Sequence, residues 1–161
     1  MKKKILVLLL SVSGLMAIAS PGDDVTSAVS ESFEHKFGED VPVSWKHIKD
    51  MYVGCFILNG QQTEAYFYDN GELMATGRNI GKNQLDEKTQ TAINKKFEGC
   101  WIQQVYELTF TNQSPEHFLI LGNIKFTAIV KVDHTGYVEV VQKKKNRLVM
   151  QENSAIQLKT M

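Results

Sequence analysis

The chain has 161 residues, 43% of them hydrophobic, and its 18 Lys and Arg balance its 18 Asp and Glu. This length suits one domain or two very small ones, with enough apolar residues for a core. Because basic residues are not in excess, the surface lacks the positive potential that nucleic-acid-binding proteins use, and this class is excluded.

Residues 1–19 contain the three parts of a secretory signal peptide. Three lysines at positions 2 to 4 precede an apolar run, which ends in the small-x-small sequence Ala17-Ile18-Ala19. The run is shorter than the roughly 20 residues of a membrane span. We therefore predict a periplasmic or secreted protein that is cleaved after Ala19 and has no stable membrane insertion afterwards. The alternative is an N-terminal anchor helix.

Cleavage would change the charge of the protein. Loss of the three lysines leaves 15 Lys and Arg (18 − 3) against 18 Asp and Glu, a net charge of −3. A mildly acidic surface does not attract nucleic acid or anionic lipid. We therefore expect no nucleic-acid partner for the mature chain.

The first predicted unit, residues 26–80, is a helix followed by four strands. Val29, Phe33 and Phe37 recur at every fourth position, as on one face of a helix, and Gly38 follows as a stop. Segments rich in β-branched and aromatic residues come next, separated by turns such as Asn59-Gly60. The predicted strands are 43–48, 51–58, 62–68 and 72–80.

The second predicted unit, residues 85–142, has the same order. LDEKTQTAINKKFEG (85–99) is typical of a helix, with acids in its first turn, lysines in its last and a glycine stop. The hairpin AYFYDNGELM (65–74) resembles AIVKVDHTGYVEV (128–140), so we interpret the two units as an internal duplication. Residues 143–161 would form a partly ordered C-terminal tail. The predicted strands are 100–110, 117–121, 124–132 and 137–142.

Residues 20–142 are predicted to form one tandem α+β domain. A helix followed by an antiparallel meander buries one face of the sheet beneath the helix and leaves the other face open. A unit of about sixty residues is marginal alone, so two units would share a better core. We expect two four-stranded sheets side by side, with both helices on one face.

Two cysteines, Cys55 and Cys100, would enter a compartment in which disulfides form. They belong to predicted strands of different units. Neighbouring strands lie about 4.8 Å apart, so a separation of two or more strands exceeds the roughly 7 Å Cα limit for a disulfide. The sequence leaves open both a disulfide and two buried, unpaired thiols.

Motifs of catalysis and metal binding are absent from the sequence, which has no GxSxG elbow, P-loop or HExxH motif. Each cysteine follows a glycine within hydrophobic sequence, a setting that does not activate a thiol. We predict a protein that is not an enzyme, with no catalytic residues, metal site or cofactor; a thiol-dependent enzyme is the alternative. Metal-ligand spacing is lacking among the four histidines, His35, His47, His117 and His134.

Aromatic residues are concentrated in the predicted strands. Because side chains alternate along a strand, Ala65 and Phe67 should face one side, and Glu64, Tyr66 and Tyr68 the other. Tyrosine and tryptophan contribute much of the binding energy in protein interfaces, although the same residues also stabilise sheets as cross-strand pairs. The predicted partner-contact residues are Trp45, Tyr66, Tyr68, Trp101 and Tyr106.

Several segments resemble one known family. They are the helix ending in KFG, the stretch VPVSWKHIKDMYVGCFILNGQQTEAYFYDNGELMATGRNI, and LDEKTQTAINKKFEG. Over most of residues 26–142 the chain resembles the PepSY-like, β-lactamase-inhibitor-like periplasmic proteins common in the Bacteroidetes. In that family a proline tends to follow Leu85, where this chain has Asp86, which helix capping tolerates. The resemblance implies a duplicated helix-plus-four-strand unit and a non-enzymatic binding or inhibitory role.

The leading functional prediction is an exported binding module that binds or inhibits another envelope or secreted protein through the open sheet face. The alternative is a periplasmic protein that binds a small ligand in a pocket between helix and sheet.

Overall fold

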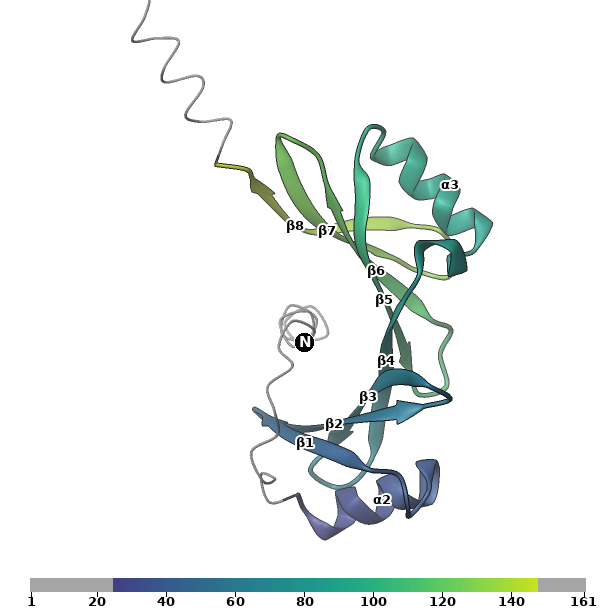
Figure 1. Ribbon diagram of the computed structural model, residues 1–161, viewed down its shortest axis with the longest axis vertical. Coiled ribbons are helices and arrows are strands. Elements are labelled where there is room, and N and C mark those ends of the chain that lie inside the picture. Colours follow the sequence, from purple (N-terminus) through teal and green to yellow (C-terminus); the bar gives the residue numbers. More distant parts are fainter. Residues whose placement is uncertain (1–24, 148–161) are drawn as a thin grey trace, which may run out of the picture.

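The computed structural model describes residues 25–147 (Figure 1), so the predicted signal peptide and all but the first residues of the predicted tail lie outside it. The described residues form one eight-stranded antiparallel sheet with its strands in chain order. Its helical elements are α2 (Ser27–Phe37), η1 (Lys82–Gln84) and α3 (Glu87–Lys96). Its strands are β1 (Val43–Ile48), β2 (Met51–Leu58), β3 (Gln61–Tyr68), β4 (Leu73–Ile80), β5 (Trp101–Phe110), β6 (Glu116–Gly122), β7 (Phe126–Val132) and β8 (Val138–Lys145).

The prediction of two separate sheets is wrong, although the α+β class is right. β4 pairs with β5 from Ala75 opposite Phe110 to Ile80 opposite Val105, so backbone hydrogen bonds connect the two halves. The physical reason is that a strand ending one unit would otherwise present a row of unpaired N–H and C=O groups. β8 also continues to Lys145, past the predicted boundary at residue 142.

Both α-helices begin and end at residues suited to those positions. Thr26 caps α2 by accepting a hydrogen bond from the Val29 N–H at 3.4 Å, and Gly38 follows the helix with φ 113°. Asp86 caps α3 by accepting from the Thr89 N–H at 2.8 Å and the Thr89 hydroxyl at 2.7 Å. These bonds hold the pKa of Asp86 below its ordinary value. Asp86 therefore starts the second helix.

Both helices lie on the same face of the sheet. Thr76 is opposite Ala65, which packs beneath α2, and Ile80 packs beneath α3. Thr76 and Ile80 are four residues apart on β4, so their side chains share a face. Figure 1 shows the sheet bent, with α2 and α3 on its outer side. We call this helix-bearing side the convex face and the opposite side the concave face.

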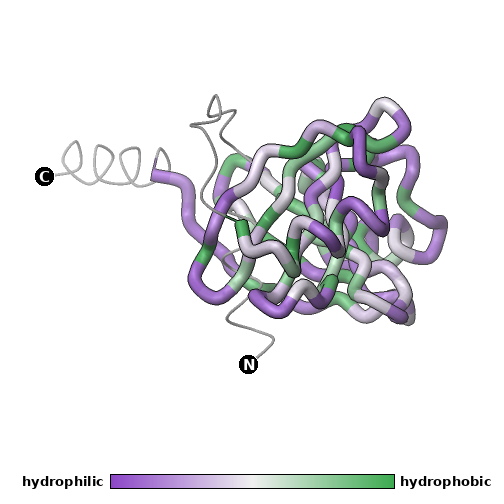
Figure 2. The backbone as a smooth tube through the Cα atoms, turned by 90° about the horizontal axis from the view of Figure 1, so that it is seen from below, coloured by the Kyte–Doolittle hydropathy of each residue, from purple (hydrophilic) through white to green (hydrophobic). Residues whose placement is uncertain are grey.

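Apolar side chains form three clusters. An aromatic cluster lies beneath α2, where the Phe33 ring meets Phe56 edge-on at a centroid distance of 4.9 Å. An aliphatic cluster around Ile93 and Leu119 lies beneath α3. The third cluster lies on the concave face and includes residues of both halves. Figure 2 shows hydrophobic and hydrophilic stretches alternating along the backbone, with hydrophilic stretches in loops at the edge of the molecule.

Within residues 25–147, neither helix has the length and apolar character that crossing a membrane requires.

Candidate functional site

The concave face is defined by the register of the strands. Cross-strand partners share a face, and one such row runs through Val53, Tyr66, Ala75 and Phe110. A neighbouring row places Tyr106 on the same face, opposite Phe118 of β6. The alternation predicted for Glu64, Tyr66 and Tyr68 agrees with this register. These residues therefore lie on the sheet face that neither α-helix covers.

Glu64, Tyr66 and Tyr106 form a buried hydrogen-bonded group, which we call the tyrosine cluster. The Tyr66 hydroxyl donates to Glu64 Oε2, and the Tyr106 hydroxyl donates to the same oxygen at 2.5 Å. The two hydroxyl oxygens are 2.8 Å apart. Glu64 is 7% exposed, Tyr66 0% and Tyr106 3%. Because hydrogen bonds to a charged acceptor are strong, the cluster fixes β3 and β5 relative to each other.

Gly77 of β4 makes room for the tyrosine cluster. A Cβ at this position would lie 2.0 Å from the Tyr106 hydroxyl oxygen. β4 lies between β3 and β5, so the side chains of the two outer strands span two strand spacings of about 4.8 Å each. They meet above β4 because residue 77 has no side chain.

Burial sets the protonation states of this region. It raises the pKa of Tyr66 and of Tyr106 far above the ordinary value, and the charge of Glu64 adds to both effects. Burial, and to a smaller extent the charge of Glu64, raise the pKa of the Cys55 thiol as well. Lys46 lowers this pKa by a smaller amount. The hydroxyls and the thiol therefore stay protonated near neutral pH. In the cluster the two hydroxyls therefore act as hydrogen-bond donors to Glu64.

Exposed aromatic side chains lie at opposite ends of the concave face. Tyr68 is 39% exposed and pairs with Met51 at the end of β3. Trp101 is 51% exposed and pairs with Gly122. Its neighbour Ile102 packs on the cluster beneath α3, so Trp101 faces the concave side. These two predicted contact residues are available to a partner.

Of the other three predicted contact residues, one lies on the convex face and two are buried. Trp45 pairs with Gly54 on the convex face, and its ring lies beneath α2, with its centroid 5.4 Å from that of Phe33. Tyr66 and Tyr106 lie on the predicted face but are buried in the tyrosine cluster. A surface role for the set Glu64, Tyr66 and Tyr68 therefore holds only for its last member.

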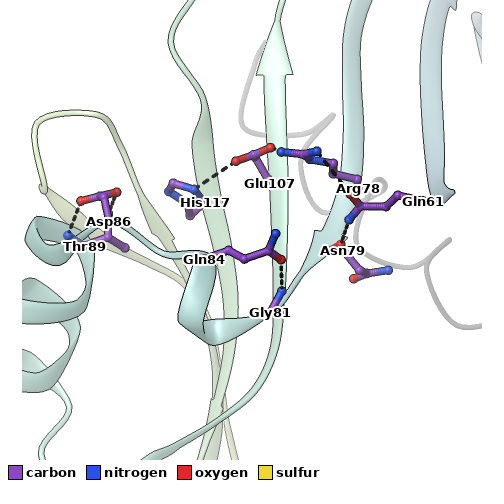
Figure 3. Close-up of polar contacts among 9 residues, drawn as sticks. All are labelled: Gln61, Arg78, Asn79, Gly81, Gln84, Asp86, Thr89, Glu107 and His117. Carbon is purple, nitrogen blue, oxygen red and sulfur yellow. Dashed lines mark hydrogen bonds and ion pairs between the residues drawn. The ribbon is translucent and has the colours of Figure 1, made fainter. Parts of the chain in front are cut away.

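A second polar group lies on the convex face between the two helix-covered clusters (Figure 3). The Glu107 carboxylate lies between Arg78, whose Nε is 2.8 Å away, and His117, whose Nε2 is 3.5 Å away. Arg78 also donates to Gln61 at 3.3 Å. We call Arg78, Glu107 and His117 the polar seam. Each member is paired with another, and the seam lies between the two convex clusters.

Both cysteines are free thiols. Cys55 lies on β2 and Cys100 directly precedes β5, three strands away, where it accepts a hydrogen bond from Asn123 Nδ2 at 3.4 Å. Of the two states that the sequence left open, the structure has the unpaired one. Across residues 25–147, no group of three or more His, Cys, Asp or Glu is arranged to hold a metal ion.

Sequence reasoning missed the roles of Glu64 and Gly77. The available signal was an acidic residue directly before the hydrophobic stretch AYFY, two positions before a tyrosine on the same face. A buried carboxylate needs hydrogen-bond donors, and tyrosine hydroxyls can supply them. The contribution of Tyr106 and Gly77 could not be read from the sequence, because it depends on the pairing of β4 with β5.

Comparison with known proteins identifies the fold. No protein-family model matches the sequence, and no curated protein matches it. Solved structures do match. A protein assigned to the periplasm of Bacteroides eggerthii has a TM-score of 0.66 and 17% identity, covering 78% of this chain and 96% of that chain. A BLIP-like protein of Bacteroides fragilis has a TM-score of 0.64 and 16% identity, covering 78% and 89%.

A DUF2874 protein of Bacteroides ovatus has a TM-score of 0.67 and 16% identity, covering 77% of this chain and 89% of that chain. At these identities the likeness concerns the fold alone, and it does not single out the PepSY-like proteins. The chain has the fold of the BLIP-like and DUF2874 proteins of Bacteroides.

Proposed function

We propose that this chain is an exported, non-enzymatic module that binds another protein through the concave face of its sheet. The observation that carries the proposal is the presence of two exposed aromatic residues, Tyr68 and Trp101, on the face opposite both helices. Tyrosine and tryptophan dominate the energetics of many protein interfaces.

The buried centre of the concave face supports this function. The tyrosine cluster fixes β3 and β5 between the two exposed aromatic residues. A surface that is already ordered loses little conformational entropy on association. The contact residues Tyr68 and Trp101 therefore project from a preorganised sheet rather than from flexible loops.

The proposal also includes a location outside the cytoplasm and an inhibitory effect on the bound protein. The signal-like residues 1–19 favour the periplasm or the cell exterior. Inhibition of the bound protein rests on analogy with one structural neighbour, a BLIP-like protein. Because one fold hosts many functions, we propose binding first and inhibition as its consequence for one class of partner.

The test is affinity capture from an envelope extract of the source organism, with mature residues 20–161 as bait. Three baits are compared: the wild-type chain, the Tyr68→Ala/Trp101→Ala double variant, and Tyr137→Ala. Tyr137 is a matched control because it is 65% exposed but lies in the turn before β8. We expect the wild type and Tyr137→Ala to retain one stoichiometric protein, and the double variant to lose it while its Tm is unchanged.

Retention of the same partner by the double variant would refute the concave face as the binding surface. Failure of the wild-type chain to retain any protein would refute protein binding itself.

A further inference from the structure

Trp101 forms an exposed aromatic platform on the concave face. A Cβ at Gly122 would lie 3.4 Å from Trp101 Cε2, so the indole lies against the backbone of the neighbouring strand. The side chain is nevertheless 51% exposed. The glycine supports one part of the ring system and leaves the rest open to a ligand.

Carboxamide side chains lie beside this platform. A bulge in β5 between Ile102 and Gln104 brings the amides of Gln103 and Gln104 toward the concave face. Gln103 Nε2 would lie 2.3 Å from a Cβ at Gly122, so this amide lies over the same glycine as the indole. Gln104 Nε2 donates to Asn79 Oδ1 of β4 at 2.6 Å. We call Asn79, Gln103 and Gln104 the amide strip.

The hydrogen bond between Gln104 and Asn79 orients the atoms that a ligand would meet. With the Gln104 amino group donating to the Asn79 carbonyl oxygen, Gln104 Oε1 remains an acceptor and Asn79 Nδ2 a donor. An acceptor next to a donor matches two neighbouring hydroxyl groups, because a hydroxyl both donates and accepts. The strip is therefore suited to a polyhydroxylated ligand.

At this end of the concave face, the outermost side chains of β2 to β5 are apolar, aromatic or carboxamide and carry no charge. Glu64 is buried toward the centre of the face, and Lys144 of β8 lies three strands from Trp101 on the same row. Trp101 pairs with Gly122 and Gln104 with Ile120, so the bulge leaves the two positions about 7 Å apart, two residues of extended strand. That distance suits two linked sugar rings. The positions concerned are Ile57, Gln62, Asn79, Trp101, Gln103 and Gln104.

We propose that Trp101 and the amide strip bind a neutral oligosaccharide. The apolar face of one sugar ring packs on the indole, and the hydroxyls of the next ring bond to Gln104 and Asn79. This site goes beyond the proposed protein-binding function. It shares Trp101 with that surface, so sugar and protein would compete there, but sugar binding does not require the protein partner. Tyr68 lies at the opposite strand ends, where β3 pairs with the first residue of β2.

The test uses the intrinsic fluorescence of the protein, which contains only two tryptophans. In mature Trp45→Phe, Trp101 is the only reporter; in Trp101→Phe, only the helix-covered Trp45 remains. Each variant is titrated to millimolar concentration with maltohexaose, cellohexaose and xylohexaose. We expect at least one sugar to produce a saturable blue shift in Trp45→Phe and none in Trp101→Phe.

Adding Gln104→Ala to Trp45→Phe should raise the dissociation constant for the sugar about tenfold, the effect of losing one good hydrogen bond. Adding Tyr137→Ala should leave it unchanged. Trp45 packs beneath α2, so we add a second measurement in which Trp45 is not replaced. It is calorimetric titration of the wild-type chain and of Trp101→Ala.

Two results would overturn the proposal. One is the absence of binding to all three sugars by fluorescence and by calorimetry. The other is sugar binding that persists unchanged in both Gln104→Ala and Trp101→Ala, which would place the sugar elsewhere.

Discussion

The two faces of the sheet are organised differently. On the convex face, an aromatic cluster beneath α2 and an aliphatic cluster beneath α3 are separated by the polar seam of Arg78, Glu107 and His117. On the concave face, one cluster includes Tyr66 from the first half and Tyr106 from the second. The halves are therefore separate beneath their helices and joined on the opposite side.

This difference explains how a helix-free face can be well ordered. An open sheet face is normally solvated, and its side chains contribute little to stability. Here the central side chains of the concave face are buried and hydrogen-bonded, while Tyr68 and Trp101 remain exposed near opposite strand ends. The same face thus joins the two halves and exposes the two aromatic side chains that we propose for binding.

The largest expected effect comes from removing a member of the concave cluster. Tyr66→Ala should lower the free energy of unfolding by about 3–5 kcal/mol, because it leaves a cavity and deprives Glu64 of a donor. Urea unfolding measures this loss. Tyr68→Ala, on the same strand and face, is the control and should cost less than about 1 kcal/mol. Equal losses in the two variants would contradict the assignment of buried and exposed positions.

A smaller effect is expected from removing the charge of the tyrosine cluster. Glu64→Gln replaces a charged acceptor of two hydroxyl groups by a neutral one and buries an amino group. We expect a loss of about 1.5–3 kcal/mol in the free energy of unfolding. Denaturant titration at pH 7 provides the value. An unchanged midpoint would mean that the carboxylate does not hold the two halves together.

Alkaline pH should weaken the join between the halves. The folded protein has raised pKa values for Tyr66 and Tyr106, whereas in the unfolded chain both titrate near about 10. Their stabilising effect is complete below pH 10. Above it the unfolded state releases protons that the folded state retains, so the free energy of unfolding falls by up to about 1.4 kcal/mol per pH unit for each hydroxyl.

Unfolding curves between pH 9 and pH 11 test this dependence. Tyr66→Phe/Tyr106→Phe should show a flatter decline, and Tyr68→Phe should match the wild type. A decline as steep in the double variant as in the wild type would assign the effect to other groups.

The smallest effect should come from the polar seam. Arg78 has a side chain 44% exposed, and partly exposed ion pairs contribute between about 0 and 1 kcal/mol. Arg78→Ala should therefore lower the free energy of unfolding by less than about 1 kcal/mol. Thermal unfolding of Arg78→Ala beside Glu64→Gln compares the two faces directly. A greater loss for Arg78→Ala than for Glu64→Gln would contradict the greater contribution of the concave face to stability.

Local features of the fold could be read from the sequence. The helix beginning after Thr26, the turn at Asn59-Gly60 and the period-two alternation around Tyr66 all follow from neighbouring residues, and the structure agrees with them. The pairing of β4 with β5 could not be read in this way. It joins residues about thirty positions apart across η1 and α3, and either one sheet or two would have satisfied the hydrophobic pattern.

The two tryptophans illustrate this limit. Each lies in the first strand after a helix, yet Trp45 is covered by α2 and Trp101 is exposed on the opposite face. Shifting a strand by one residue moves every side chain to the other face. Whether a tryptophan belongs to the core or to a binding surface therefore depends on strand register, which composition does not reveal.

Photo-crosslinking in cells of the source organism tests the central claim most directly. A benzoylphenylalanine is placed at position 68 or 101 on the concave face, or at position 140. Val140 is 44% exposed and pairs with Val130 of the cluster beneath α3, so it serves as the convex-face control. We expect the same protein adduct from positions 68 and 101 and none from position 140. An adduct from position 140 alone would contradict the concave face as the binding surface.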